Sequence, residues 1–209
     1  MTIGASIRSM FGPYERQVSE AYRSIYLDLD EFVEQVRRWS PYPRRILEVG
    51  CGEGAVTERL HAAFPGAHII AIDVTSRIGR LYQGRQAGVC FVQCDIQELA
   101  ASKAGPFDLV VLCDVLHHVA LGSRQGLLNA IRATLAPHGS FIFKDWQRSN
   151  TPIHWLCYAS DRWLTGDRIG YMTRDEMRQH LALSFGGGAL VSETRVGPRW
   201  NNLAILVRP

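Results

Sequence analysis

The chain has 209 residues, a formal charge of +3 and an apolar fraction of 46%, which is ordinary for a globular protein. No apolar run approaches the roughly 18 residues that a membrane-spanning helix needs, so the composition excludes such a helix. Residues 1–12 lack a cationic segment followed by a long apolar one. We therefore expect no signal peptide, a cytoplasmic location and one domain over residues 1–209.

The basic residues are almost all arginine, because lysine occurs only at Lys103 and Lys144. An excess of arginine can indicate contact with phosphate or RNA. Here the acidic residues are interspersed with the arginines, and no block of five like charges occurs. We therefore attribute the excess to the base composition of the gene.

The cysteines predict reduced thiols in a cytosolic protein. There are five of them, no C-x-x-C pair occurs, and several lie in apolar, strand-like stretches. An odd number without paired spacing argues against a disulfide framework and against a zinc site.

The predicted elements begin with a helix over residues 14–39. Apolar residues recur there at three- and four-residue steps from Val18 to Val36, which marks one face of a helix. Serine and prolines at 40–43 end this helix. A strand and a helix follow at 45–49 and 55–63, joined by a glycine-rich turn.

The next hundred residues alternate between strands and helices. The predicted strands lie at 68–72, 89–93, 107–112 and 140–143, and the predicted helices lie at 76–86 and 123–135. The run at 107–112 is apolar apart from Asp108, as expected for a strand that is buried on both faces. Strands that alternate with helices predict a parallel sheet with right-handed crossovers.

The segment 146–172 interrupts this alternation. Thr151-Pro152 resembles a helix start, and apolar and aromatic residues follow it at helical spacing. The capping-box pattern Thr173-x-x-Glu176 predicts a further helix. Two strands remain, at 189–196 and 202–207.

The glycine turn after the first predicted strand carries the strongest functional signal. Glycines at 50, 52 and 54 allow positive φ angles and a close approach of the backbone to a ligand. The helix that follows offers free N–H groups at its start. The turn lies at the carboxyl end of a parallel strand, where open α/β sheets bind their ligands.

A dinucleotide is one candidate for this turn, because Gly50-x-Gly52-x-x-Ala55 with Asp73 about 20 residues later fits the dinucleotide pattern. Two features oppose it. The carboxylate of Glu48 would repel a pyrophosphate but attract a cationic sulfonium amino acid. The third glycine, Gly54, extends the motif to E-x-G-x-G-x-G.

The sequence at this point resembles the class I S-adenosylmethionine (SAM)-dependent methyltransferases, especially their small-molecule branch, over about residues 44–145. Residues 48–54 match the first motif of the family, and 107–119 match its fourth strand and active-site loop. Residues 135–141 match the turn into the fifth strand. The resemblance implies a Rossmann-like α/β fold with a seven-stranded, mostly parallel sheet and an antiparallel last strand. Residues 14–39 and 146–172 are then expected to cover the cleft, the latter as a substrate lid.

The resemblance also implies a set of cofactor-binding residues. Asp73 is expected to bind the ribose hydroxyls, while Asp95 accepts from the adenine amine and Ile96 packs on the ring. The full predicted set for SAM, with S-adenosylhomocysteine as product, is Glu48, Gly50, Cys51, Gly52, Gly54, Asp73, Val74, Asp95, Ile96, Cys113 and His118.

The predicted catalytic residues Asp114, His117 and His118 follow the fourth strand. A histidine can act as a base near neutral pH, but either histidine can instead position the cofactor, and both interpretations stay open. No third ligand is evident beside the two histidines, so we expect no metal. The predicted substrate residues are Lys144, Trp146, His154 and Tyr158.

The predicted function is methyl transfer to a small organic acceptor, with oxygen as the first choice and carbon as the second. The aromatic character of 146–172 favours an apolar or aromatic acceptor. A nucleic-acid or protein methyltransferase is one alternative, although residues 113–116 lack the N/D-P-P-Y pattern of many nucleic-acid amino-methylating enzymes. A SAM-fold protein that does not methylate, such as a cyclase or a binding protein, is the other. We expect a small-molecule partner and no nucleic acid, and the sequence does not predict an oligomeric state.

Overall fold

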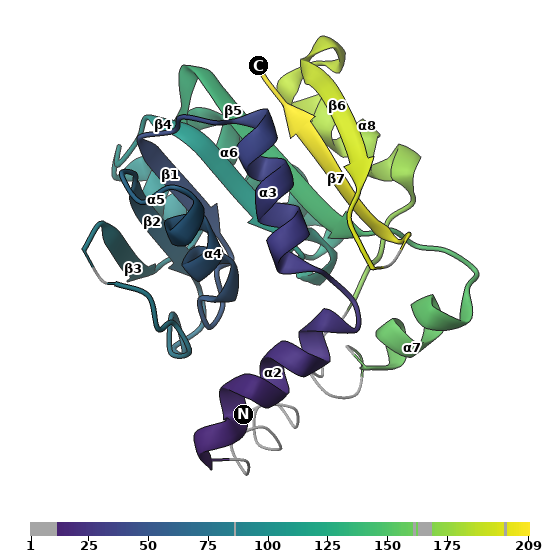
Figure 1. Ribbon diagram of the computed structural model, residues 1–209. Helices are drawn as coiled ribbons and strands as arrows, with labels where there is room; N and C mark the ends of the chain where they lie inside the picture. Colours follow the sequence, from purple (N-terminus) through teal and green to yellow (C-terminus); the bar gives the residue numbers. More distant parts are fainter. Residues whose placement is uncertain (1–11, 86, 161, 163–168, 199) are drawn as a thin grey trace.

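A computed structural model describes residues 12–85, 87–160, 162, 169–198 and 200–209. Its centre is a seven-stranded sheet with the strand order β3-β2-β1-β4-β5-β7-β6 (Figure 1). β7 runs antiparallel to both of its neighbours, and the other neighbouring strands are parallel. The strands are β1 (Arg45–Val49), β2 (His68–Asp73), β3 (Val89–Gln93), β4 (Phe107–Cys113), β5 (Leu135–Trp146), β6 (Leu190–Arg195) and β7 (Asn202–Val207). The expected Rossmann-like fold is confirmed.

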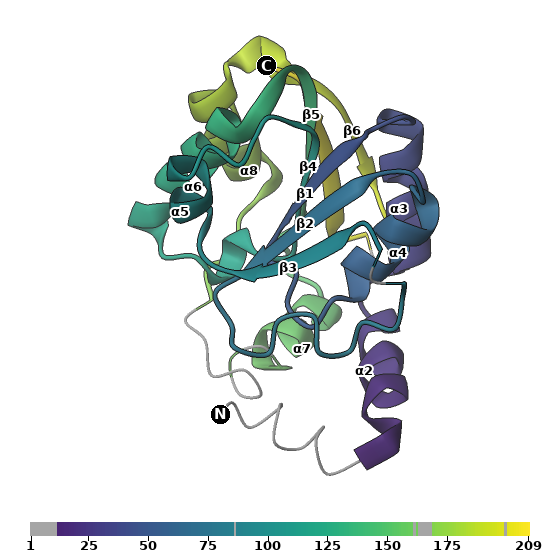
Figure 2. The same ribbon diagram turned by 90° about the vertical axis from the view of Figure 1, so that its left-hand side faces the viewer.

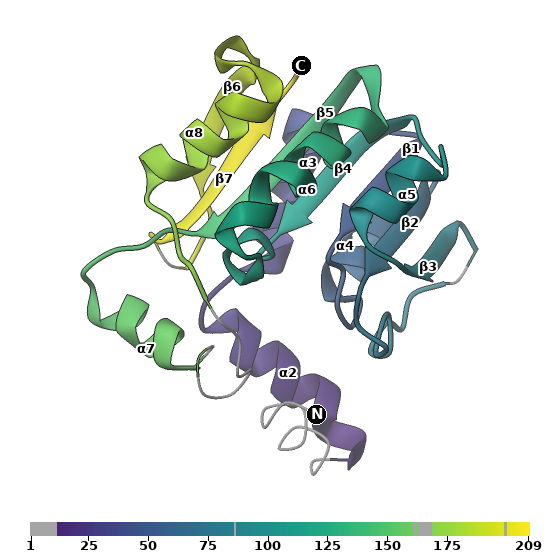
Figure 3. The same cartoon turned by 180° about the vertical axis from the view of Figure 1, so that it is seen from behind.

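Helices cover both faces of the sheet. α3 (Leu29–Trp39) and α4 (Ala55–Ala63) lie on the face seen in Figure 1, and α5 (Ile96–Ala101), α6 (Leu121–Thr134) and α8 (Arg174–Phe185) lie on the face seen in Figure 3. Each face buries its own apolar cluster. Alternate residues of β4 enter the two clusters, which explains why this strand is apolar without a break after Asp108.

Two helices lie beyond the edge of the sheet at which the parallel strands end. They are α2 (Glu15–Ser24) and α7 (Pro152–Ser160), and Figures 1 and 2 both show them at this end of the molecule. Of the segments expected to cover the cleft, α2 and α7 lie at the carboxyl edge, whereas α3 packs on a face of the sheet. None of the described helices has the length and apolar character that crossing a membrane requires.

The prediction of one helix over 14–39 is wrong. A short 3-10 helix (Gly12–Tyr14) precedes α2, and residues 25–28 separate α2 from α3. The carboxylate of Asp28 accepts hydrogen bonds from the backbone N–H groups of Asp30 and Glu31, at 3.0 and 2.9 Å. This side-chain cap begins a second helix within a stretch whose apolar spacing is continuous.

The prediction of a helix over 76–86 is also wrong for the residues that the structure describes there, which form successive turns. Gly79 has a φ of +63°, and a Cβ atom on it would lie 2.8 Å from the ring of Phe91. The backbone of Gly79 packs directly against Phe91 of β3, where a helix would have presented side chains.

A helix that the sequence analysis did not predict, α5, begins after Asp95. The Asp95 carboxylate accepts from the backbone N–H of Glu98 at 2.8 Å, and the Glu98 carboxylate accepts from the N–H of Asp95 at 3.0 Å. This capping box was visible as D-x-x-E, but we had interpreted Asp95 only as a ligand residue.

Other element limits agree more closely. β7 and α4 lie as predicted, and Thr173 caps α8 with the expected capping box. β5 extends from Leu135 to Trp146 and is therefore much longer than the predicted strand at 140–143. In the segment 146–172, α7 begins at the predicted Thr151-Pro152 start, while residues 161 and 163–168 lie outside the described residues.

Candidate active site

Two neighbouring cavities open at the carboxyl edge of the sheet. The first, which we call the aromatic cavity, is lined by Tyr22, Tyr26, Trp146 and Tyr171 together with residues from β1, β4 and β5. The second, the strand-end cavity, is lined by residues that include Asp73, Val74, Asp95 and Ile96. Their volumes of about 360 and 560 Å³ lie in the range of roughly 300–1,000 Å³ that is common for small-molecule sites.

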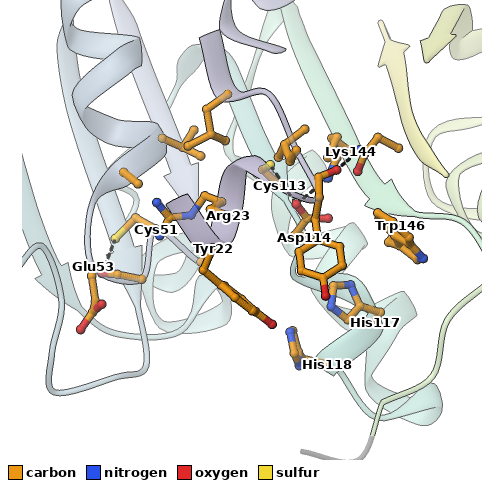
Figure 4. A pocket seen from close by; sticks show the side chains of 18 of the residues that line it. Tyr22, Arg23, Cys51, Glu53, Cys113, Asp114, His117, His118, Lys144 and Trp146 are labelled. Carbon is orange, nitrogen blue, oxygen red and sulfur yellow. Dashed lines mark hydrogen bonds and ion pairs between the residues drawn. The ribbon is translucent and has the colours of Figure 1, made fainter. Parts of the chain in front are cut away.

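The two cavities share three lining residues, Gly50, Asp114 and His118. Figure 4 shows His118 and Tyr22 extending toward each other at the edge of the aromatic cavity. One ligand that spans the shared residues can therefore reach into both cavities.

The glycine turn after β1 shapes the boundary between the cavities. Gly50 has a φ of +76°, and a Cβ atom there would lie 2.3 Å from the Val115 side chain. Gly52 has a φ of +52°, and a Cβ atom on it would project into open space. Gly54 lines neither cavity as described; it precedes α4 with a φ of +95° and packs against Tyr82. The first two glycines thus keep the ligand side clear, whereas Gly54 serves chain packing.

Two carboxylates flank this turn. Glu48 is 2% exposed, and among the described residues its Oε2 atom has no hydrogen-bond partner. Burial, with a smaller effect of the nearby Asp73, raises the pKa of Glu48 to about 7. Asp73, at the end of β2, accepts from the backbone N–H groups of Gly52 and Thr75, each at 2.8 Å. These bonds fix the Asp73 carboxylate against the turn, and each oxygen retains a further lone pair.

Asp114 and Lys144 form an ion pair at the ends of β4 and β5 (Figure 4), with a distance of 2.5 Å between Nζ and Oδ2. Asp114 has a φ of +55°, an uncommon backbone conformation for a residue other than glycine. Burial opposes the charge on Lys144, but the carboxylates of Asp114 and Asp145 outweigh it and the pKa of Lys144 is raised. The Cys113 thiol beside the pair stays protonated, because burial raises its pKa well above the usual value.

His117 and Asp145 form a second buried pair, and both side chains are at most 4% exposed. His117 Nδ1 and Asp145 Oδ1 lie in direct contact, and the His117 backbone N–H donates to Asp145 Oδ2 at 3.1 Å. Burial raises the pKa of Asp145, but the His117 imidazole, the Lys144 ammonium and the Trp146 N–H more than offset this and hold it below its usual value. An Asp–His pair of this kind orients an imidazole for proton transfer.

Asp145 belongs to a stretch, residues 144–146, that was expected to face the cleft, but only Lys144 and Trp146 were predicted as site residues. Its partner His117 lies 28 positions earlier in the chain, and the predicted β5 stopped before it. The only signal was an acid directly after Lys144 at the end of a buried strand. Tyr171, another lining residue that was not predicted, follows a stretch with no recognisable periodicity.

The predicted substrate residues divide into two groups. Lys144 and Trp146 line the aromatic cavity, whereas His154 and Tyr158 line neither described cavity. The Trp146 indole N–H donates to His154 Nδ1 at 3.0 Å. The buried His154 therefore packs behind Trp146, which itself lines the aromatic cavity. Among the predicted cofactor residues, Cys51 and Cys113 line the aromatic cavity, and Val74, Asp95 and Ile96 line the strand-end cavity.

Two carboxylates lie close to His117, which the sequence did not indicate. Ligand atoms of Asp114, His117 and Asp145 all lie within 4.8 Å of one another, which is close enough for a metal ion. However, Asp114 is already paired with the Lys144 ammonium, and Asp145 with His117. A divalent cation would have to displace a buried positive charge to bind here.

The site fits a ligand with a positive charge and a sugar. The open space beside Gly52 admits a ligand against the backbone, and no donor from the described part of the chain reaches the buried Oε2 atom of Glu48. Asp73 and Asp95 stand at the ends of β2 and β3, where carboxylates can accept from hydroxyl and amine groups. These features suit the sulfonium, ammonium, ribose and adenine of SAM.

Comparison with known proteins agrees with this geometry. Residues 47–141 match the family model of a methyltransferase domain. A ubiquinone biosynthesis O-methyltransferase from Bordetella avium is 32% identical over 111 residues, which cover 51% of this chain and 44% of the relative. A trans-aconitate 2-methyltransferase from an Acidovorax species is 34% identical over 125 residues, 59% of this chain and 47% of the relative. The chain thus spans about half the length of the curated relatives it matches.

Solved structures with the same fold cover nearly the whole chain. A 1,6-didemethyltoxoflavin-N1-methyltransferase from Burkholderia thailandensis, with its substrate and S-adenosylhomocysteine bound, has a TM-score of 0.66 at 20% identity, covering 98% of this chain and 87% of its own. The N-methyltransferase NodS from Bradyrhizobium japonicum, with S-adenosylhomocysteine, has a TM-score of 0.65 at 24% identity and covers 90% of each chain. The fold, the glycine turn with its acids and the matched domain over residues 47–141 together support a class I SAM-dependent methyltransferase.

Proposed function

We propose that the protein transfers a methyl group from SAM to a hydroxyl oxygen of a small aromatic acceptor, with carbon as the second candidate atom. The observation that carries this proposal is the buried His117–Asp145 pair at the wall of the aromatic cavity. A phenolic hydroxyl, with a pKa of about 10, must lose its proton as it is methylated, whereas a carboxylate is already ionised at neutral pH. A built-in base therefore favours a hydroxyl over a carboxylate acceptor.

The cofactor would extend across the residues that the two cavities share. Asp73 would accept from the ribose hydroxyls, and Asp95 and Ile96 would meet the adenine in the strand-end cavity. Gly50, Gly52 and Glu48 would hold the amino-acid end, with the Glu48 carboxylate facing the positive charge. SAM supplies, when bound, a methyl group on a positively charged sulfur.

The acceptor would lie in the aromatic cavity. Tyr22, Tyr26 and Trp146 offer apolar ring surfaces that suit a planar ring and exclude water. The Nδ1–H group of His117 would donate a hydrogen bond to Asp145. The Nε2 atom would then accept the proton of the acceptor hydroxyl. Asp145 would then stabilise the imidazolium, as a buried carboxylate does for a histidine base.

The proposal is tested by mass spectrometry of reactions with SAM and a panel of phenols, catechols and small carboxylic acids. A product 14 daltons heavier than a hydroxyl-bearing ring compound supports it. A carboxyl ester as the sole product would contradict the hydroxyl assignment. Tight SAM binding with no product from any acceptor class would favour a protein that binds SAM without methylating.

A further inference from the structure

The chain that returns from the inserted segment is attached to the loop that carries His117. The backbone N–H of Gly170 donates to the His117 carbonyl at 2.8 Å. Arg124, on α6, donates from Nη2 to the Gly170 carbonyl at 2.5 Å and from Nε to the Val119 carbonyl at 3.0 Å. Arg124 thus links Gly170, near the end of the inserted segment, to Val119, at the end of the loop that carries His117.

Arg124 is an unusual residue to find in this place, because it is 1% exposed. Among the described residues no carboxylate accepts a hydrogen bond from it, and burial lowers the pKa of its guanidinium. A buried charge is costly unless it is hydrogen-bonded, and here backbone carbonyls supply the bonds. The fit is tight, since a Cβ atom on Gly170 would lie 2.6 Å from Arg124 Nη2.

Tyr171, the residue after Gly170, contacts the imidazole of His117. The Tyr171 ring stacks on the His117 ring with a centroid distance of 4.8 Å and an interplanar angle of 27°. The Tyr171 hydroxyl lies 3.3 Å from Cys157 Sγ on α7, and its ring meets the edge of His154 at 5.2 Å. Tyr171 is therefore fixed from the side of α7 and presents a face to His117.

Neither the Asp145 contact nor the His118 ring, which lies 4.1 Å from the His117 ring but is tilted by 42°, holds a flat face against the imidazole. A ring held at Nδ1 can still tilt about the line that joins Nδ1 to the carboxylate, and this would move Nε2 away from the acceptor. A flat aromatic ring stacked against the imidazole resists that tilt. Misplacement of a catalytic group by about 1 Å can reduce turnover about 100-fold.

We propose that Tyr171 and Arg124 are positioning residues for His117, so that the inserted segment sets the orientation of the base as well as covering the cavity. The proposal rests on the proposed function only in that it takes His117 as the base. The orientation of the ring is a property of the protein and can be measured without turnover.

The test compares Tyr171→Leu, Tyr171→Phe and the distant control Tyr42→Leu by ¹⁵N NMR of the histidine side chains, with S-adenosylhomocysteine present. Tyr42 is 91% exposed and lies in the loop before β1, so Tyr42→Leu makes the same chemical change away from the site. We expect a single Nδ1–H tautomer of His117 in the wild type, Tyr171→Phe and Tyr42→Leu. In Tyr171→Leu we expect the Nδ1–H bond to Asp145 to persist while the Nε2 and Cε1–H signals of His117 broaden by exchange, because the ring can then tilt about that bond.

Arg124→Lys provides a second variant, because a lysine keeps the charge but lacks the planar fork that donates to two carbonyls. We expect the same change of the His117 signals, with S-adenosylhomocysteine affinity within about twofold of the wild type as a check of folding. Sharp and unshifted Nε2 and Cε1–H signals of His117 in both Tyr171→Leu and Arg124→Lys would overturn the proposal.

Turnover then separates this proposal from the proposed function. With an identified acceptor, Tyr171→Leu should lower kcat about 10- to 100-fold with little change in the KM for SAM, and Tyr171→Phe should restore it. If His117→Ala retains full activity, His117 is not the base, and the NMR result still decides whether Tyr171 orients it.

Discussion

Lys144 and Asp114 form an ion pair across the ends of two neighbouring strands, with the ammonium 1% exposed and the carboxylate 34% exposed. The pair is therefore asymmetric: the lysine depends on the aspartate for its charge, whereas water can reach the aspartate. Because of this asymmetry, we expect the loss of the aspartate and the loss of the lysine to change the free energy of unfolding by different amounts.

Replacing Asp114 by Asn should destabilise the protein more than replacing Lys144 by Met. The first change leaves a buried ammonium beside one fewer carboxylate, and removal of one partner of a buried pair costs about 3–5 kcal/mol. The second leaves a carboxylate that water can hydrate, so we expect about 1–2 kcal/mol after allowing for solvent screening. Urea unfolding measures both, and Lys103→Met, at the exposed second lysine, is the matched control. Equal losses for both partners would contradict the asymmetry.

Removal of the imidazole should abolish most activity without loss of cofactor binding. His117→Ala is expected to lower kcat about 100- to 10,000-fold, the usual contribution of a general base. Calorimetric affinity for SAM should change little, because the proposed cofactor contacts come from Asp73, Asp95 and the glycine turn and not from His117. The exposed His138, at the opposite edge of the sheet, supplies the control variant His138→Ala. A mutant that turns over normally would remove His117 from the mechanism.

The buried Glu48 should make stability depend on pH around neutrality. Its pKa is raised from 4.5 to about 7 in the folded protein, so folding favours the protonated acid. The stabilisation is fully present below pH 4.5 and is lost as the pH rises through about 7. At about 1.4 kcal/mol per pKa unit this amounts to roughly 3 kcal/mol.

The comparison of wild type with Glu48→Gln isolates this effect. The variant should unfold with a free energy that declines less than that of the wild type between pH 5 and 8. Glu34→Gln, on the exposed face of α3, should retain the wild-type decline. Identical pH profiles for the wild type and Glu48→Gln would show that Glu48 is charged throughout this range.

Asp73 should contribute to cofactor affinity through charge-assisted hydrogen bonds. Asp73→Ala is expected to weaken SAM binding by about 1–3 kcal/mol. Because Asp73 also accepts from Gly52 and Thr75, the variant must be checked for folding by thermal unfolding. Unchanged affinity in a folded variant would count against the ribose assignment.

Ionic strength should loosen α2 selectively. The buried residues of this helix are only Glu15 and Ser19, and ion pairs such as Arg80–Glu15 and Arg16–Glu58 connect it to the rest of the chain. Salt screens partly exposed pairs, as the Debye length falls from about 10 Å at 0.1 M to about 3 Å at 1 M. Hydrogen exchange in α2 should therefore accelerate with added salt.

The helix α3 is the internal control for this measurement. It buries Phe32, Val33 and Val36, and apolar packing does not weaken with added salt. Its hydrogen exchange should stay constant while that of α2 rises. A parallel rise in both helices would indicate general destabilisation instead.

The sheet could be predicted from the sequence because its signals are local. The central strands contain short runs of consecutive apolar residues, and the glycine turn lies directly after β1. The acid Asp73 could be located because its chain position alone puts it at the end of β2. These features need no knowledge of contacts between distant residues.

The remaining parts of the site depend on contacts that sequence spacing does not encode. The link between His117 and Asp145 joins two strand ends, and the stack of Tyr171 on His117 joins a loop to a returning segment. The break before α3 was missed because apolar spacing continues through Asp28, whose cap begins a new helix. His154 was predicted as a substrate residue from its place in the inserted segment. The sequence does not show that its ring turns toward the Trp146 indole and away from the cavity.

The four rings that define the aromatic cavity come from stretches on either side of residues 47–141, the part shared with other methyltransferases. The rings proposed to contact the acceptor therefore lie outside the matched stretch, whereas the residues proposed to bind the donor lie within it. Consider a chimera that combines residues 47–141 of this chain with the flanking stretches of a relative. It should methylate the relative's acceptor and bind SAM with the affinity of this chain.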